Sequence, residues 1–95
     1  MFAPDAYFWS GELFLAQEML EDAKISFNNV IDRFPNHLRA PDSLFKLGEI
    51  SRLEEDFSSA TNFYKKVQEI YPQTGAAQLA KKSEENLKQQ SKLVN

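Results

Sequence analysis

The sequence predicts an all-α fold of antiparallel helix hairpins in tandem, and three observations support this prediction. The chain matches itself when it is shifted by 37 residues. Within each copy, apolar residues recur at spacings of three and four, which is the period of a helix face. Prolines stand where such helices would begin and end. We expect one domain over residues 1–95, with five helices: one unit over about 4–35, a second over about 41–72, and a capping helix over about 74–92.

The 37-residue shift aligns residues that would start, pack and stop the helices. The identical pairs are Ala3/Ala40, Pro4/Pro41, Asp5/Asp42, Phe8/Phe45, Gly11/Gly48, Glu12/Glu49, Glu18/Glu55, Ala23/Ala60, Val30/Val67 and Pro35/Pro72. Proline is tolerated in the first turn of a helix, where an N–H would lack a partner in any case. An aspartate directly after it lies near the positive end of the helix dipole. Each unit therefore predicts its own helix starts and stops.

Each unit is expected to bury one stripe per helix. In the first unit the stripes are Tyr7, Phe8, Gly11, Phe14 and Leu15, and, after a turn at 18–21, Ala23, Phe27, Val30, Ile31 and Phe34. In the second unit they are Leu44, Phe45, Leu47 and Gly48, then Phe57, Ala60, Tyr64, Val67 and Tyr71. The last helix has a narrow stripe of Ala76, Leu79, Ala80, Ser83 and Leu87 on a polar background. That pattern is typical of a helix that caps a stacked array.

Gly11 and Gly48 occupy the same phase of the two units. A glycine inside a helix costs about 0.5–1 kcal/mol relative to alanine, so its recurrence indicates close helix contact where a Cβ would clash. We expect Gly11 to face Ala23, and Gly48 to face Ala60, within each hairpin.

These positions resemble those of the tetratricopeptide repeat (TPR) family, whose repeat is shorter by the three residues that fall here near 37–39. The matching residues are Gly11, Ala23, Phe27 and Pro35, then Gly48, Ala60, Tyr64 and Pro72. The resemblance implies a right-handed superhelix. Ser10 stands where an apolar residue is usual, Ser51 stands where an aromatic one is usual, and neither hairpin turn contains glycine. From these departures we expect looser local packing.

More narrowly, residues 5–13, 33–48 and 70–77 resemble the C-terminal TPR domain of the YbgF (CpoB) family of the Tol–Pal system. That resemblance implies a periplasmic adaptor that binds TolA and coordinates peptidoglycan synthesis with envelope constriction at cell division. Members of that family carry an upstream coiled coil. The start of this chain has no signal-peptide pattern, so either the protein is not exported or the chain is an excised domain. The resemblance favours an excised domain, because that coiled coil is missing here.

Several function classes are disfavoured by composition. The net charge of −3, with both signs mixed, does not suit nucleic acid, and no segment approaches the roughly 20 apolar residues of a membrane span. There is no cysteine, and His37 has no second histidine for a metal or a nucleophile. We expect the adjacent carboxylates at 54–56 and 84–85 to lie on the solvated surface. We expect no catalytic, cofactor or metal site, and no enzyme.

The resemblance places partner segments on the concave side, which the first helix of each unit lines. The expected binding residues are Asp5, Phe8, Trp9, Glu12 and Ala16, then Asp42, Phe45, Lys46, Glu49 and Leu53, and from the last helix Leu79, Lys82 and Asn86. They would form an apolar floor edged with acid, suited to an extended or helical segment with apolar anchors and some Lys or Arg. Trp9 is the expected hot spot, because aromatic residues dominate interface energies.

Structural readings compete with these assignments. Helix-start electrostatics alone explain Asp5 and Asp42. Phe8 and Phe45 could belong to the core, and Trp9 could pack on a preceding repeat. Such readings leave open a structural or oligomerising module without a groove.

Other functional alternatives also stay open. An exposed N-terminal face of Phe2, Tyr7 and Phe14 could drive self-association. A BamD-like or other envelope TPR scaffold, and a cytoplasmic TPR regulator or chaperone adaptor, fit the same repeats.

Overall fold

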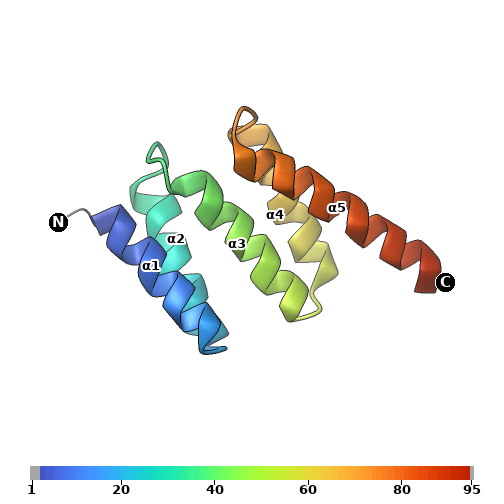
Figure 1. The fold of residues 1–95 in the computed structure, drawn as a ribbon, viewed down its shortest axis with the longest axis horizontal. Coiled ribbons are helices and arrows are strands. Elements are labelled where there is room, and N and C mark those ends of the chain that lie inside the picture. The colour runs from blue at the N-terminus through green and yellow to red at the C-terminus, as the bar shows by residue number, and fades with distance from the viewer. Residues whose placement is uncertain (1–2, 95) are drawn as a thin grey trace.

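A computed structural model of the chain describes residues 3–94, with the side chains of residues 3–90. Its helices are α1 (Ala3–Ala16), α2 (Leu20–Arg33), α3 (Ala40–Leu53), α4 (Phe57–Ile70) and α5 (Gly75–Val94). Figure 1 shows α1, α3 and α5 in the nearer layer, with α2 and α4 behind them. The molecule measures 48 × 30 × 16 Å, and its least dimension is that of two packed helix layers. The predicted all-α hairpin fold is confirmed.

Three helix starts have a local signal in the sequence: a proline at α3 and side-chain caps at α4 and α5. Pro41 stands at the start of α3, and Asp42 follows it in the first turn. At α4 the Asp56 carboxylate accepts a hydrogen bond from the backbone N–H of Ser59 (3.2 Å). Hydrogen bonding from Ser59, first through its side chain and then through its backbone N–H, holds the pKa of Asp56 below its usual range. At α5 the hydroxyl of Thr74 plays the same capping part.

Both hairpin turns contain a glutamate in the left-handed region. Glu18 and Glu55 each have φ of 61°, and they are equivalent under the 37-residue shift. In both turns the N–H of the next residue bonds to a carbonyl five residues earlier at 2.9 Å. The turns therefore keep the closed geometry that glycine would favour, at a backbone cost of roughly 1–2 kcal/mol each.

The core runs between the two helix layers. Its fully buried large side chains are Tyr64, Phe27, Ile50, Val30 and Val67, with Ser43 among them. These residues come from α2, α3 and α4, so the second repeat packs directly on the first. Ser51 is also buried.

In each repeat, the glycine in the first helix makes room for an aromatic ring. A Cβ on Gly11 would lie 2.7–2.9 Å from ring atoms of Phe27, and one on Gly48 would lie 2.7 Å from the ring of Tyr64. The predicted close contact is confirmed, but the nearest neighbour differs from the expectation of Ala23 and its counterpart. The ring is longer than a methyl group and reaches across the interface, so it takes the space that the glycine leaves.

Two contacts tie the repeats together at opposite edges of the slab. At the edge of the hairpin turns, Lys24 Nζ lies 2.9 Å from a carboxylate oxygen of Glu54, which raises the pKa of Lys24. At the edge of the inter-repeat loops, the Tyr71 hydroxyl donates a hydrogen bond to the Pro35 carbonyl (2.7 Å). Figure 1 shows these two edges as the lower and upper ends of the first four helices.

Helix α5 caps the array with one packed face and one polar face. It packs on α4 and α3. Its buried residues are Ala76, Ala77, Ala80, Glu84 and Leu87. The buried stripe is thus rotated from the prediction: Leu79 is 54% exposed, and Ser83 is only half-buried. The shift has a physical reason, since 77, 80, 84 and 87 lie on one helix face, and Gln68 of α4 donates a hydrogen bond to Glu84 (2.9 Å).

Candidate functional site

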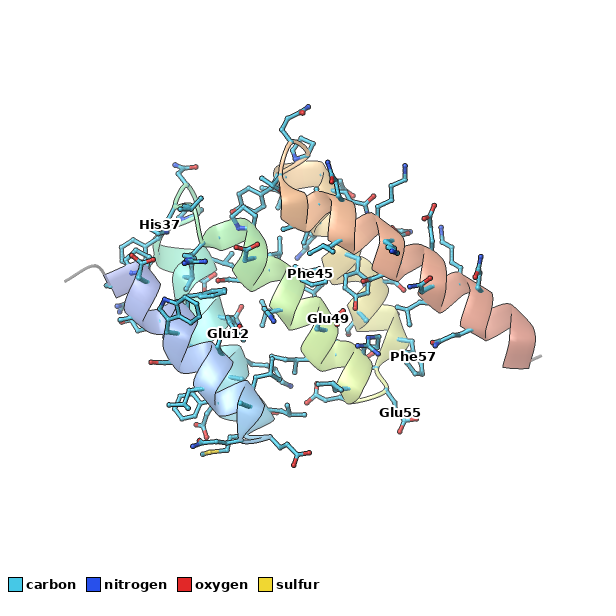
Figure 2. All side chains as sticks on the ribbon, in the orientation of Figure 1. Glu12, His37, Phe45, Glu49, Glu55 and Phe57 are labelled. Atoms are coloured by element: carbon cyan, nitrogen blue, oxygen red, sulfur yellow. The ribbon has the colours of Figure 1, made fainter. Side chains whose placement is uncertain are left out.

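The predicted binding residues lie on α1, α3 and α5. We name these helices the A helices, and the face that they share the A-helix face. Figure 2 shows Glu12, Phe45 and Glu49 on this side of the molecule. Trp9 and Leu53 are 54% and 56% exposed there, whereas the charged residues of α1 and α3 are half-buried. Exposed polar or small residues complete the set: Ala16, Lys82 and Asn86.

Phe8 does not form an available floor, because it is 4% exposed and belongs to the core. Its ring meets the edge of Phe27 with centroids 5.8 Å apart, and that of Trp9 at 5.2 Å. Phe45 is half-buried, with its ring centroid 5.8 Å from that of Tyr64. The core reading therefore applies to Phe8, and Phe45 lies at the boundary between core and surface.

Arg39 covers the aromatic part of the face, although no sequence pattern singled it out. Its guanidinium carbon lies 4.8 Å from the ring centroid of Phe8 and 5.0 Å from that of Trp9. Its Nε lies 3.5 Å from a carboxylate oxygen of Asp5, and its Nη1 lies 4.0 Å from one of Asp42. These contacts combine cation–π attraction with ion pairing across α1 and α3.

His37 helps to place Arg39. The Nδ1 atom of His37 accepts a hydrogen bond from the backbone N–H of Arg39 (3.0 Å), which fixes the loop just before α3. This contact gives His37 a structural role in the loop. The signal that could have pointed to Arg39 is its position in the three-residue insertion between the repeats, but spacing alone does not show where such a side chain lies.

The other acidic residues of the A-helix face also have internal partners. Glu12 Oε1 lies 3.2 Å from Lys46 Nζ, an ion-pair contact between α1 and α3 without hydrogen-bond geometry. Glu49 accepts hydrogen bonds from the Tyr64 hydroxyl and from Arg52 Nη2 (3.0 Å), and its charge raises the pKa of Arg52. The expected acidic edge is thus largely neutralised within the molecule.

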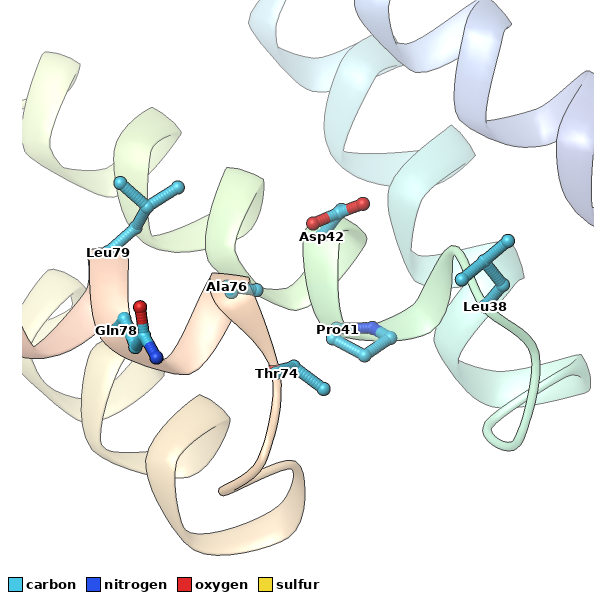
Figure 3. A pocket seen from close by; sticks show the side chains of 8 residues that line it. Leu38, Pro41, Asp42, Thr74, Ala76, Gln78 and Leu79 are labelled. Atoms are coloured by element: carbon cyan, nitrogen blue, oxygen red, sulfur yellow. The ribbon is translucent and has the colours of Figure 1, made fainter.

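An open hollow of about 610 Å³ lies between the N-terminal ends of α3 and α5 (Figure 3). Its lining residues are Leu38, Pro41, Asp42, Thr74, Gly75, Ala76, Gln78 and Leu79. Leu38 is 79% exposed. Of these residues only Asp42 and Leu79 were expected at a binding surface. A smaller hollow of about 200 Å³ lies against α4 and is lined by Ser59, Asn62, Phe63 and Lys66.

The part of the chain that the structure describes has no group of three or more His, Cys, Asp or Glu side chains placed to hold a metal ion. Over residues 3–94, no helix combines the length and the hydropathy that crossing a bilayer requires. The arrangement offers surfaces for contact, with exposed apolar side chains between ion pairs.

Tandem hairpins that pack on their neighbours and share one exposed face define the class of helical repeat proteins, which bind through extended surfaces. The sequence pattern described as Tetratricopeptide repeat matches residues 5–37 and 42–74. These matches cover more than half of the chain, so it belongs to the tetratricopeptide repeat family. The two matched ranges begin 37 residues apart, as the repeat predicted. A search of curated proteins finds no match. TPR repeats generally mediate protein–protein interaction and are typically not enzymes.

Proposed function

We propose that this chain is an interaction module whose A-helix face binds a segment of another protein. The observation that carries the proposal is the exposure of Trp9, a large aromatic side chain that is 54% accessible and held in place by Arg39. A rigid, exposed indole is the kind of anchor on which interface energy concentrates. Leu53 offers a second apolar contact on the same face.

The ion pairs around Trp9 define what the partner segment must bring. Because Asp5 and Glu12 already have cationic neighbours at 3.5 Å and 3.2 Å, a partner gains little at these two carboxylates from added base alone. Apolar anchors supply most of the affinity in this proposal, and the half-buried charges orient the segment and exclude like-charged partners.

We further propose that the module acts in the periplasm as a Tol–Pal-associated adaptor whose partner is TolA-like, and that it serves envelope constriction in cell division. The support is the resemblance of residues 5–13, 33–48 and 70–77 to the YbgF (CpoB) family. Exposed Trp9 lies within the first of these segments.

The experiment that tests this proposal titrates the ¹⁵N-labelled protein with segments of TolA. Binding should shift the backbone amides of Trp9, Glu49 and Leu53. Trp9→Ala should weaken binding by more than about tenfold, as expected for a hot spot, with helicity unchanged. Ile25→Ala is the matched control, because Ile25 is 61% exposed on α2 in the other layer. Equal loss of helicity and binding in Trp9→Ala, or no binding of TolA segments, would count against the proposal.

Self-association is a second candidate, favoured by a bare face on α1. Leu13 is 59% exposed, whereas its repeat counterpart Ile50 is fully buried. Tyr7 and Phe14 flank that face and are half-buried, while Phe2 lies outside the described residues. Sedimentation of Leu13→Glu tests this candidate: a dimer that dissociates in the variant supports it, and a wild-type monomer at all concentrations contradicts it.

A further inference from the structure

The two spaces between successive A helices are built alike but filled differently. The 37-residue shift that maps α1 onto α3 and α3 onto residues 77–90 of α5 also maps Asp5 onto Asp42 and Arg39 onto Ala76. Between α1 and α3 the space is occupied by the side chain of Arg39. Between α3 and α5 the corresponding residue is an alanine, and the open hollow of about 610 Å³ lies there.

The first space shows what this geometry accepts. The Arg39 guanidinium forms an ion-pair contact, without hydrogen-bond geometry at Nε, with Asp5 in the first turn of the preceding A helix, and it lies over the Phe8 ring. Its side chain is only 29% exposed, so its stem is packed while its charged head meets a carboxylate. The molecule thus supplies a guanidinium to its own first site.

The second space keeps the carboxylate but lacks the guanidinium. Asp42 lines the hollow, and its contact with Arg39 at 4.0 Å is the longest ion pair among the described residues. Arg39 lies closer to Asp5, at 3.5 Å. Leu38 and Leu79, both exposed, line the same hollow as Asp42 (Figure 3). The hollow therefore combines a weakly neutralised carboxylate with apolar walls.

We propose that this hollow binds an arginine side chain of the partner protein, seated as Arg39 is seated between α1 and α3. The inference rests on the proposed binding role and gives it a specificity site. The guanidinium pairs with Asp42, and Leu38 and Leu79 contact the aliphatic stem and the apolar residues beside it. Lys46 replaces Trp9 in this second site, but its ammonium group lies 3.2 Å from Glu12 on the α1 side.

The main competing ligand is a carboxylate, because the hollow borders the N-terminal end of α5, where the helix dipole favours an anion. Two observations favour the cation. The Thr74 hydroxyl already accepts a hydrogen bond from the backbone N–H of Ala77 at that end (3.1 Å). The first site also places its guanidinium beside a helix start, just before α3.

The test uses the full chain and three peptides: acetyl-Ala-Leu-Arg-Leu-Ala-amide, the same peptide with citrulline for Arg, and the same peptide with Glu for Arg. Citrulline keeps the shape of arginine without its charge. At millimolar peptide, the Arg form should shift the backbone amides of Asp42, Ala76 and Leu79. The citrulline form should bind about tenfold more weakly, since it lacks the positive charge that pairs with the Asp42 carboxylate. Equal affinity of these two peptides, or preference for the Glu peptide, would overturn the proposal.

Variants then assign the site. Asp42→Asn should reduce the affinity for the Arg peptide to that of the citrulline peptide, whereas Asp32→Asn, the same charge change at an exposed position on α2, should leave it unchanged. Ala76→Arg should fill the hollow with an internal guanidinium and abolish peptide binding. If Ala76→Arg does not fold, Leu79→Ala replaces it and should weaken binding at least threefold. Unchanged affinity in both Asp42→Asn and the folded hollow variant contradicts the assignment.

The outcome separates this inference from the proposed function. TolA segments that shift Trp9 while the Arg peptide leaves the hollow unaffected would overturn the arginine site and retain the interaction module. Selective Arg-peptide binding at the hollow would support the site even if TolA segments do not bind at Trp9, and in that case the TolA proposal fails.

Discussion

The Tyr64 hydroxyl donates a hydrogen bond to the Glu49 carboxylate and so links α4 to α3 within the second hairpin. The first hairpin has Glu12 at the equivalent position but Phe27 in place of the tyrosine, and Glu12 pairs instead with Lys46 of the next A helix. The two equivalent glutamates thus have different partners, one within its own repeat and one in the next.

Tyr64→Phe should destabilise the fold by about 1.5–3 kcal/mol, because the hydrogen bond goes to a charged group and Glu49 is left with Arg52 alone. The ring itself should still fit, since Phe27 fills the equivalent space. Urea unfolding followed by circular dichroism measures the change. Tyr71→Phe, which loses an exposed bond to the Pro35 carbonyl, is the control and should cost less. A wild-type stability in Tyr64→Phe would show that the contact contributes nothing.

Alkaline pH should narrow the difference between wild type and Tyr64→Phe. Burial first, and the Glu49 hydrogen bond and charge second, raise the pKa of Tyr64 above its usual value of 10.0. The folded state then keeps the phenol proton that the unfolded state loses, so this contribution is complete below about pH 10 and declines above it. Between the two pKa values the wild-type folding equilibrium should weaken about tenfold per pH unit relative to the variant. Unfolding curves that run parallel from pH 9 to pH 12 would contradict this.

Gly48→Ala should destabilise the fold by about 1–3 kcal/mol, because the new Cβ would lie 2.7 Å from the fully buried ring of Tyr64. The helix-propensity gain of about 1 kcal/mol offsets only part of that cost. Gly75→Ala is a matched control, since a Cβ there meets nothing within 4 Å. The thermal midpoint should therefore fall in the first variant and stay level or rise in the second.

Glu55→Gly should stabilise the fold by about 1 kcal/mol, because Glu55 adopts φ of 61°, where glycine carries no Cβ penalty. Part of the gain is lost to the greater freedom of glycine in the unfolded chain. Lys65→Gly, at an exposed site in the middle of α4, should instead destabilise by about 1 kcal/mol. Differential scanning calorimetry distinguishes the two, and a loss of stability in both would mean that the turn carries no backbone strain.

Arg39→Ala should destabilise the fold by about 1–2 kcal/mol, through loss of the Asp5 ion pair and of the contacts with two aromatic rings. Trp9 is the one tryptophan of the chain, so its fluorescence reports on this site alone, and its emission should shift to the red. Arg39→Lys should be intermediate, because lysine keeps the charge but not the planar group. An emission spectrum that is unchanged in both variants would argue against stacking in solution.

The helices could be predicted because their signals are periodic and local. Proline starts, apolar spacing and the glycines recur at 37 residues, and α1 to α4 form where these signals predict helices, although α2 begins at Leu20, inside the turn expected at 18–21. The packing partner of Gly11 could not be predicted, because both Ala23 and Phe27 lie on the expected stripe of α2. Only the way in which α1 and α2 cross in space selects the ring of Phe27.

The binding surface could be predicted only in part. The expected helices share one face and Leu79 is exposed on it, but Phe8 is buried in the core. Arg39 was missed because its loop has no period, and a long side chain can reach several partners. The acidic edge looked open in sequence, since ion pairs such as Glu12–Lys46 join residues that are far apart along the chain.

The two contacts that join the repeats at opposite edges of the slab respond to different solution conditions. The Lys24–Glu54 ion pair at one edge weakens as salt screens it, whereas the Tyr71–Pro35 hydrogen bond at the other edge is formed by neutral groups. Rising ionic strength therefore weakens the contact at the edge of the hairpin turns and leaves the contact at the edge of the inter-repeat loops in place. Ionic strength should therefore adjust the angle between the two repeats.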